Sequence, residues 1–346
     1  MPAHFLVFVK KFHVCLQFKI PTMFYLLRKA HLLQLSIGVI VLLACGVMVF
    51  LKPLDVSLFN NSLPCACAFS QWLSVHPVGT QFIALTFLLL QAALLLSYVR
   101  MSGFLDEENV LSILFFCAFS LGMGILLPFS PAWFTNTATL AVLNLINHTS
   151  TSNSKTALLV AGIVLGAAIL FDFTAVLLIV FFILYILINQ IDKLRDLLAT
   201  LCGILLPHLY LIVHHYLADS LPAYLHSFTQ LHLHFPLFTQ THPSFYSLIA
   251  MGIGLLLTIY VMVRLKVLYN NKLIVIRRRF LFLCVLFCFN IAMLLFTNIP
   301  FPYSLAYLLI PVTVFIIAFI PVRNFAISTE ILLSLLTASL VVMARM

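Results

Sequence analysis

Repeated apolar runs of about twenty residues are the feature that most constrains this chain, because a helix needs that length to cross the hydrocarbon of a bilayer. The segment 77–98 is one such run, and residues 82–90 within it are apolar on every side of a helix. A transmembrane barrel would instead show shorter segments that alternate apolar and polar residues. The runs therefore predict an all-α fold, a polytopic bundle of transmembrane helices.

Composition excludes a water-soluble fold. Hydrophobic residues make up 64% of the 346 residues and charged residues only 8%, against roughly a quarter charged in soluble domains. The formal net charge of +9 comes from Lys and Arg at the ends of apolar runs, which is typical of topology determinants and of contact with anionic lipid. A nucleic-acid binder would cluster these cations on a polar face with stacking aromatics. We therefore expect membrane lipids, and no nucleic acid, as partners.

The runs predict about eleven spans, with about ten to twelve as the range, in one transmembrane domain over 32–346. The region 156–190 is predicted as a hairpin that turns at Asp172, because a single helix of that length would measure about 50 Å and exceed the bilayer. The predicted spans are 32–51, 77–98, 110–127, 132–147, 156–171, 173–190, 197–217, 245–263, 280–297, 303–320 and 325–343.

Lys and Arg are unevenly divided between the two sides of this predicted bundle. If the N-terminus is cytoplasmic, all but two of the 18 cations fall inside, and only Lys52 and Arg345 fall outside. Loops retained in the cytoplasm carry the excess of cations. The predicted topology therefore has a cytoplasmic N-terminus, an exterior C-terminus, and two long exterior loops at 52–76 and 218–244.

The N-terminal segment 1–31 is predicted to be cytoplasmic or interfacial. Residues 1–22 are a short mixed stretch, either an interfacial amphipathic segment or sequence upstream of a start at Met23. The first long apolar run begins near Leu32 and shows no small-residue cleavage site, so we expect an uncleaved first helix.

Two glycines mark a helix-packing face. Gly162 and Gly166 stand about one turn apart with alanines beside them, and small residues at this spacing let another helix backbone approach closely. The neighbour could be a helix of this chain or of another membrane subunit.

Two acidic residues lie within or beside predicted spans, where an ionised carboxylate must reach water or a partner. Asp172 is either a helix-turn residue that caps the next span or a proton or cation site. Glu330 lies a few residues into the last predicted span and could snorkel toward Arg323 at the inner surface.

Histidines gather between residues 208 and 242. The candidates for metal ligation are His214 with His215 and His232 with His234. Histidine also suits a membrane interface, and the region has no strict ligand spacing or HExxH motif. We interpret it as interfacial and assign neither metal nor cofactor.

Several short motifs from Met23 onward resemble a bacterial family of multi-spanning inner-membrane proteins of unknown function, and this resemblance implies a location in the bacterial inner membrane. The motifs are the basic start 23–29, Leu-Pro-Phe-Ser-Pro at 127–131 followed by Asn136 through Asn147, the glycine-containing run 161–171, Gly-Ile-Leu-Leu-Pro at 203–207, Ile310-Pro311, and Glu330.

The glycine-containing helix followed by Phe-Asp-Phe-Thr-Ala is also similar, more distantly, to the membrane cores of glycosyltransferases that use polyprenyl-phosphate sugars. Those enzymes carry acidic residues in the first exterior loop as base or metal ligand. Here Asp55 occupies that place, so the resemblance implies a catalytic role for Asp55.

The sequence thus leaves three functional interpretations. The first is a non-catalytic accessory or scaffold protein in cell-envelope assembly, and it is the one we favour. The alternatives are a lipid-linked-sugar transferase, which needs an exterior acidic cluster, and a transporter or flippase, which needs polar residues lining a path through the membrane.

Overall fold

The computed structural model describes residues 63–104, 129–149, 154–188, 193–229, 258–267, 273–297 and 303–319, together with a few isolated positions. Throughout these ranges the chain forms helices and the turns between them, with no strand. The predicted all-α class is confirmed for this part of the chain. The predicted spans 32–51, 110–127 and 325–343, and most of 245–263, lie outside it.

Three described helices are long and apolar enough to cross a membrane. They are α4 (Pro77–Ser102), most of α9 (Lys193–Leu217) and α12 (Ile274–Phe296). At 1.5 Å per residue, helices of this length reach about 35 to 39 Å, more than the hydrocarbon thickness. The chain is therefore a membrane protein, as the apolar runs predict.

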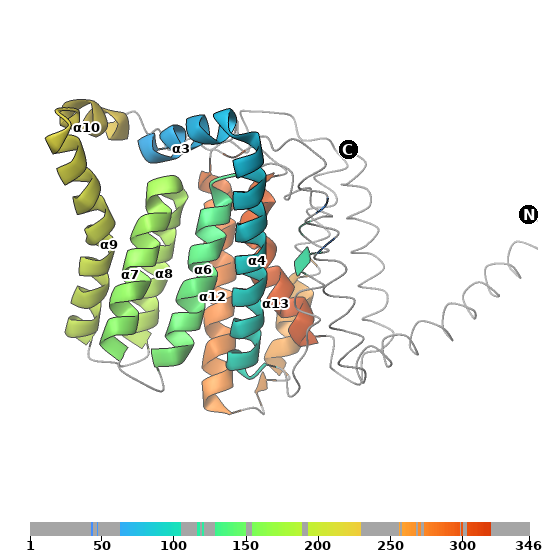
Figure 1. Cartoon of the computed structure of the whole chain (residues 1–346). Helices are drawn as coiled ribbons and strands as arrows, with labels where there is room; N and C mark the ends of the chain where they lie inside the picture. The colour runs from blue at the N-terminus through green and yellow to red at the C-terminus, as the bar shows by residue number, and fades with distance from the viewer. Residues whose placement is uncertain are drawn as a thin grey trace, which may run out of the picture.

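Shorter helices lie alongside the long ones. They are α6 (Ala132–Thr149), α7 (Ser154–Phe171), α8 (Val176–Ile188) after the 3-10 turn η2 (Phe173–Ala175), and α13 (Leu309–Phe319) after η4 (Tyr303–Leu308). In Figure 1, α4, α6, α7 and α9 form a row in which each helix packs on the next, and α8, α12 and α13 lie behind it.

Two further helices lie at one end of the bundle, α3 (Pro64–Val75) and α10 (Leu221–Thr229) (Figure 1). The sequence predicts loops at these positions. Proline at the start of α3 suits a first helical turn, and Ala66 and Leu73 are buried against the bundle while Trp72 and Val75 are exposed. An amphipathic helix across the end of a bundle is typical of a membrane interface.

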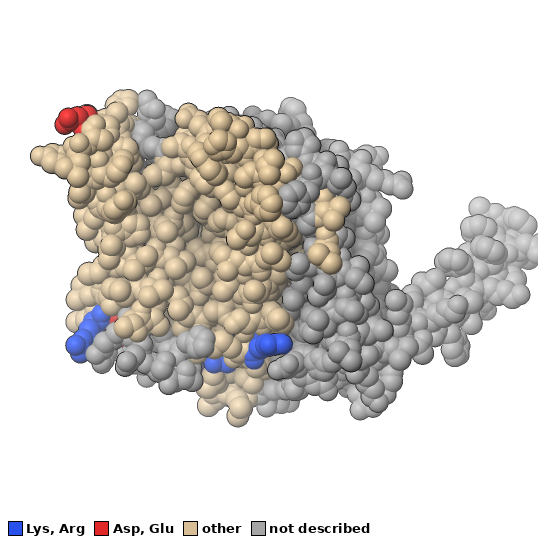
Figure 2. Space-filling view, in the orientation of Figure 1, with Lys and Arg blue, Asp and Glu red and all other residues tan. Residues whose placement is uncertain are grey.

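The opposite end of the bundle carries basic side chains. Among the described residues, Figure 2 shows blue side chains there with a little red beside them, a red group at the α10 end, and no charged side chain along the middle of the visible face. Arg100 near the end of α4 and Arg195 at the start of α9 belong to this basic end. Arg279 of α12 also lies there, because its Nη1 donates to the carbonyls of Met101 at 2.6 Å and Ser102 at 3.0 Å. An apolar band between two charged ends matches a bilayer.

Candidate functional site

Asp172 is the centre of the most polar buried cluster among the described residues. It follows the last residue of α7, has an extended backbone (φ −138°, ψ 104°), and is the N-cap of η2. Its Oδ1 accepts from the backbone N–H of Thr174 at 3.1 Å and from the Thr174 hydroxyl at 2.6 Å. A cap of this kind is the local role that the sequence predicts for an acid at a helix turn.

The other carboxylate oxygen of Asp172 is held by distant parts of the chain. The Thr135 hydroxyl of α6 donates to Oδ2 in a short hydrogen bond, and the Tyr307 hydroxyl of η4 donates to the same atom at 2.7 Å. Each carboxylate oxygen therefore faces two donors, which uses its lone pairs. Asp172 is only 5% exposed, and these four bonds offset the cost of burying a carboxylate.

A second group of bonds fixes Tyr307 toward Asp172. The Thr297 hydroxyl lies 3.3 Å from the Tyr307 hydroxyl and accepts from the Ile299 N–H at 3.2 Å. Because Tyr307 gives its proton to Asp172, Thr297 donates to Tyr307. The Asn290 side chain of α12 also donates to the Tyr307 carbonyl at 2.7 Å. A chain of donors thus runs from the end of α12 to the carboxylate.

The α6 side of η4 is held in the same way. Asn136 Nδ2 donates to the Ala306 carbonyl at 2.9 Å, and Asn136 is next to Thr135 in the sequence. Two consecutive polar residues of α6 therefore bond to two different partners, Asp172 and η4. The cluster joins α6, the α7–η2 junction, α12 and η4.

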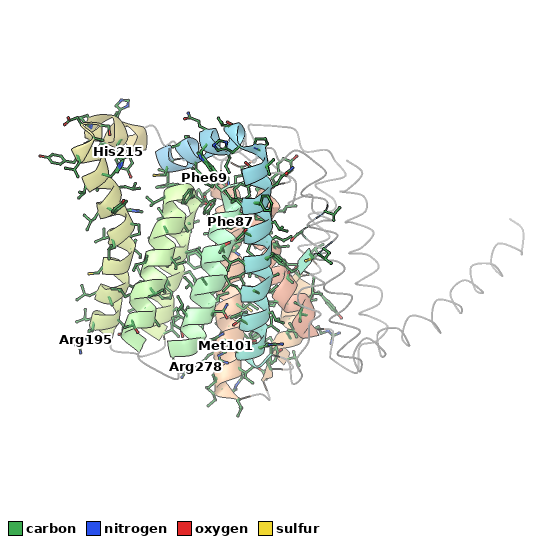
Figure 3. The ribbon with its side chains drawn as sticks, in the orientation of Figure 1. Phe69, Phe87, Met101, Arg195, His215 and Arg278 are labelled. Atoms are coloured by element: carbon green, nitrogen blue, oxygen red, sulfur yellow. The ribbon has the colours of Figure 1, made fainter. Side chains whose placement is uncertain are left out.

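An aromatic cluster connects α3 with Phe171, the residue that precedes Asp172. Phe171 stacks on Phe134 with ring centroids 4.0 Å apart, and Phe69 of α3 meets the edges of both at 5.6 and 5.7 Å. Phe87 of α4 adds a contact with Phe134 at 4.8 Å. Figure 3 shows Phe69 beneath α3 and Phe87 on α4. These rings pack α3 against α4, α6 and α7.

The predicted packing glycines lie against α9 of the same chain. A Cβ added to Gly162 would overlap the Thr200 carbonyl oxygen and lie 3.0 Å from the Cα of Gly203. A Cβ added to Gly166 would lie 2.5 Å from the carbonyl oxygen of Ile204. Gly203 on α9 is subject to the same restriction, because a Cβ there would overlap the Leu159 carbonyl oxygen. Three glycines therefore set the distance between α7 and α9.

His214 and His215 lie at the end of α9, where His214 is exposed. His215 Nδ1 hydrogen-bonds to Ser220 Oγ at 2.8 Å, and its ring stacks on Tyr224 of α10 with centroids 4.3 Å apart. This contact organises the α9–α10 turn, where Asp219 has a positive φ of 50°. Among the residues that the structure describes, no group of three or more His, Cys, Asp or Glu could hold a metal ion.

The remaining predicted site residues lie outside the described ranges. They are Asp55, His232, His234 and Glu330. Sequence reasoning identified Asp172 but missed Thr135 and Tyr307, which lie 37 and 135 residues away. The available signal was the series of polar residues along α6, among them Thr135 and Asn136. Comparison with protein-family models, curated proteins and solved structures finds no match to the chain.

Proposed function

We propose that this chain is a multi-pass protein of the bacterial inner membrane that acts as a non-catalytic accessory or scaffold component in cell-envelope assembly. The observation that carries the proposal is the saturation of Asp172. A general base or an ion ligand needs a lone pair that faces its substrate. Here both carboxylate oxygens are occupied by donors from within the protein, so the acid joins helices together.

Other polar side chains in the described helices support the same role. Gln91 of α4 donates to the Trp133 carbonyl and to Thr137 Oγ1, both at 2.9 Å. Asn144 of α6 donates to the Leu94 carbonyl of α4 at 2.8 Å. A transporter would direct such groups toward a path through the membrane, whereas these bond to neighbouring helices and favour a rigid bundle.

The proposed topology has about eleven spans, a cytoplasmic N-terminus and an exterior C-terminus. The helix boundaries support it, because α4, α6, α7, α8, α9 and α12 begin or end within a few residues of predicted spans. The basic side chains at the end of the bundle away from α3 support the orientation. In this arrangement α3 and α10 lie at the exterior interface.

Thiol labelling of intact cells tests this orientation. In a cysteine-free background, a restored Cys67 on α3 should react with a membrane-impermeant reagent, while Asn270→Cys should react only after the cells are permeabilised. Cys67 is partly exposed and Asn270 is exposed, so both report topology and not burial. Labelling of Asn270→Cys but not Cys67 in intact cells would reverse the orientation.

The non-catalytic role is tested at Asp55, the residue on which the transferase alternative depends. We expect Asp55→Asn to accumulate to normal levels and to complement a deletion strain, because loss of a surface charge, which the predicted exterior loop 52–76 would make it, costs at most about 1 kcal/mol. Loss of a general base would reduce the rate by about 10² to 10⁴. If the Asp55→Asn protein is produced at normal levels but behaves as a null, and a lipid-linked sugar accumulates, the scaffold role is wrong and the transferase alternative holds.

A further inference from the structure

Helices α7 and α9 touch closely over one half of their length and separate over the other. Their contact is fixed by Gly162, Gly166 and Gly203, where the backbones leave no room for a Cβ. Beyond this contact, toward α3, lies a hollow of about 400 Å³. Its walls are the side chains that follow the glycines on both helices, and Cys65 of α3 closes one end.

Proline contributes to this separation. Pro207 lies inside α9 and lines the hollow. It has no N–H to donate to the carbonyl of Gly203, one turn back, so the helix loses a hydrogen bond just after the close contact. The remaining walls are Ile163, Leu170, Phe171, Leu206, Tyr210 and Leu211.

The hollow between α7 and α9 is open to the outside of the bundle, beside the exposed face of α9. Leu206 is 51% exposed and Tyr210 is 71% exposed. α9 is also the least buried of the three helices long enough to cross the membrane, and it lies at the edge of the row in Figure 1. This face of α9 is therefore in contact with lipid hydrocarbon.

Exposed aromatic residues of α3 and of the adjoining end of α9 mark the headgroup level. Trp72 of α3 and Tyr216 near the end of α9 are exposed, and such rings are enriched where hydrocarbon meets headgroups. A hydrocarbon chain that starts at this level would enter the hollow directly below α3.

We propose that the hollow between α7 and α9 is a binding site for one acyl chain of a bilayer phospholipid, whose headgroup lies beside α3 and α10. The proposal rests on the membrane arrangement given above. The apolar walls of the hollow have too few polar groups to hold water. If the hollow were empty, the wall side chains would lose dispersion contacts. In this arrangement lipid hydrocarbon surrounds the exposed face of α9, so an acyl chain fills the space.

Photocrosslinking in nanodiscs tests the site. The purified full chain is reconstituted with phosphatidylcholine that carries a diazirine on one acyl chain, then diluted into an excess of unlabelled nanodiscs for increasing times before photolysis. Adducts are located by mass spectrometry of peptides. We expect adducts at Leu206 and Leu211 to decay about tenfold more slowly than those at Leu209 and Val213, because affinity differences of related sites lie mostly in dissociation. Leu209 and Val213 are exposed and do not line the hollow.

Two variants separate the possible outcomes. Leu170→Trp fills the hollow and should abolish the slowly decaying adducts, while Leu209→Trp on the outer face of α9 should leave them unchanged. If Leu170→Trp fails to fold, the difference in decay between hollow and outer-face positions in the wild-type protein still tests the site. If adducts at hollow and outer-face positions decay at equal rates, the hollow contains only ordinary surrounding lipid, and the proposed binding site is wrong. Absence of any adduct at Leu209 and Val213 would overturn the membrane arrangement itself.

Discussion

Substitution of the interface glycines by alanine should destabilise the protein, whereas the same change at Gly79 should not. In a helix interior, alanine is intrinsically better than glycine by about 0.8 to 1 kcal/mol, so without tertiary contacts each variant would gain stability. At Gly79 an added Cβ would meet only His76 and Trp72 atoms at 3.5 and 3.7 Å, which is ordinary contact. Gly79→Ala is therefore a matched control.

At Gly166 the added Cβ would lie 2.5 Å from the Ile204 carbonyl oxygen. Ordinary contact begins about 1 Å further away, so α7 and α9 must move apart by roughly that distance. A gap of this size forfeits a quarter to a half of the dispersion energy of the affected atom pairs. Overpacking of this kind costs about 1 to 3 kcal/mol, which over most of that range exceeds the gain in helix propensity. We expect a net loss of up to about 2 kcal/mol for Gly166→Ala, and a similar loss for Gly162→Ala.

The assay is reversible unfolding in mixed micelles, in which sodium dodecyl sulfate is titrated into a mild detergent and helix content is followed by far-UV circular dichroism. Gly162→Ala and Gly166→Ala should unfold at lower dodecyl sulfate fractions than the wild type, and Gly79→Ala at an equal or higher fraction. If Gly166→Ala unfolds with or after the wild type while Gly79→Ala behaves as stated, the close α7–α9 contact is refuted.

Four further predictions concern single side chains and use the same assay unless stated. Asp172→Ala should destabilise the protein by about 3 kcal/mol, since it leaves four donors without their acceptor. Tyr307→Phe should destabilise it by about 1 kcal/mol. An Asp172→Ala variant as stable as the wild type would contradict the hydrogen bonds around the carboxylate. Gln91→Leu should cost only about 0.5 to 1 kcal/mol, because the Thr137 hydroxyl continues to donate to the Trp133 carbonyl; a loss above about 2 kcal/mol would contradict this. Burial raises the pKa of the Cys65 thiol, which lowers the fraction of thiolate at neutral pH. The alkylation rate of Cys65 should therefore keep rising above about pH 8.5, where a free cysteine is half ionised. A rate that levels off below that pH would contradict the burial of Cys65.

Local properties of the sequence determined the class of the protein and most helix boundaries. The length and hydropathy of the runs specified helices in a membrane, because in hydrocarbon every backbone N–H and C=O must be bonded within its own helix. The break at Asp172 was predicted for the same reason, since a continuous helix over 156–190 would exceed the bilayer. The small-residue face at Gly162 and Gly166 was also visible, because its spacing is a property of a single helix.

The tertiary structure decided which helices meet and which groups share a bond. Nothing local indicated that Thr135 and Tyr307 would donate to Asp172, or that Gly203 would face Gly162. Lipid is as apolar as the helix surfaces, so hydrophobicity does not select a partner helix, and the choice depends on close packing and on a few interhelical hydrogen bonds. The helix α3 was predicted as loop because it lies at the interface and is shorter than a span. The amphipathic pattern of α3 can be recognised only once the structure shows Ala66 and Leu73 buried against the bundle.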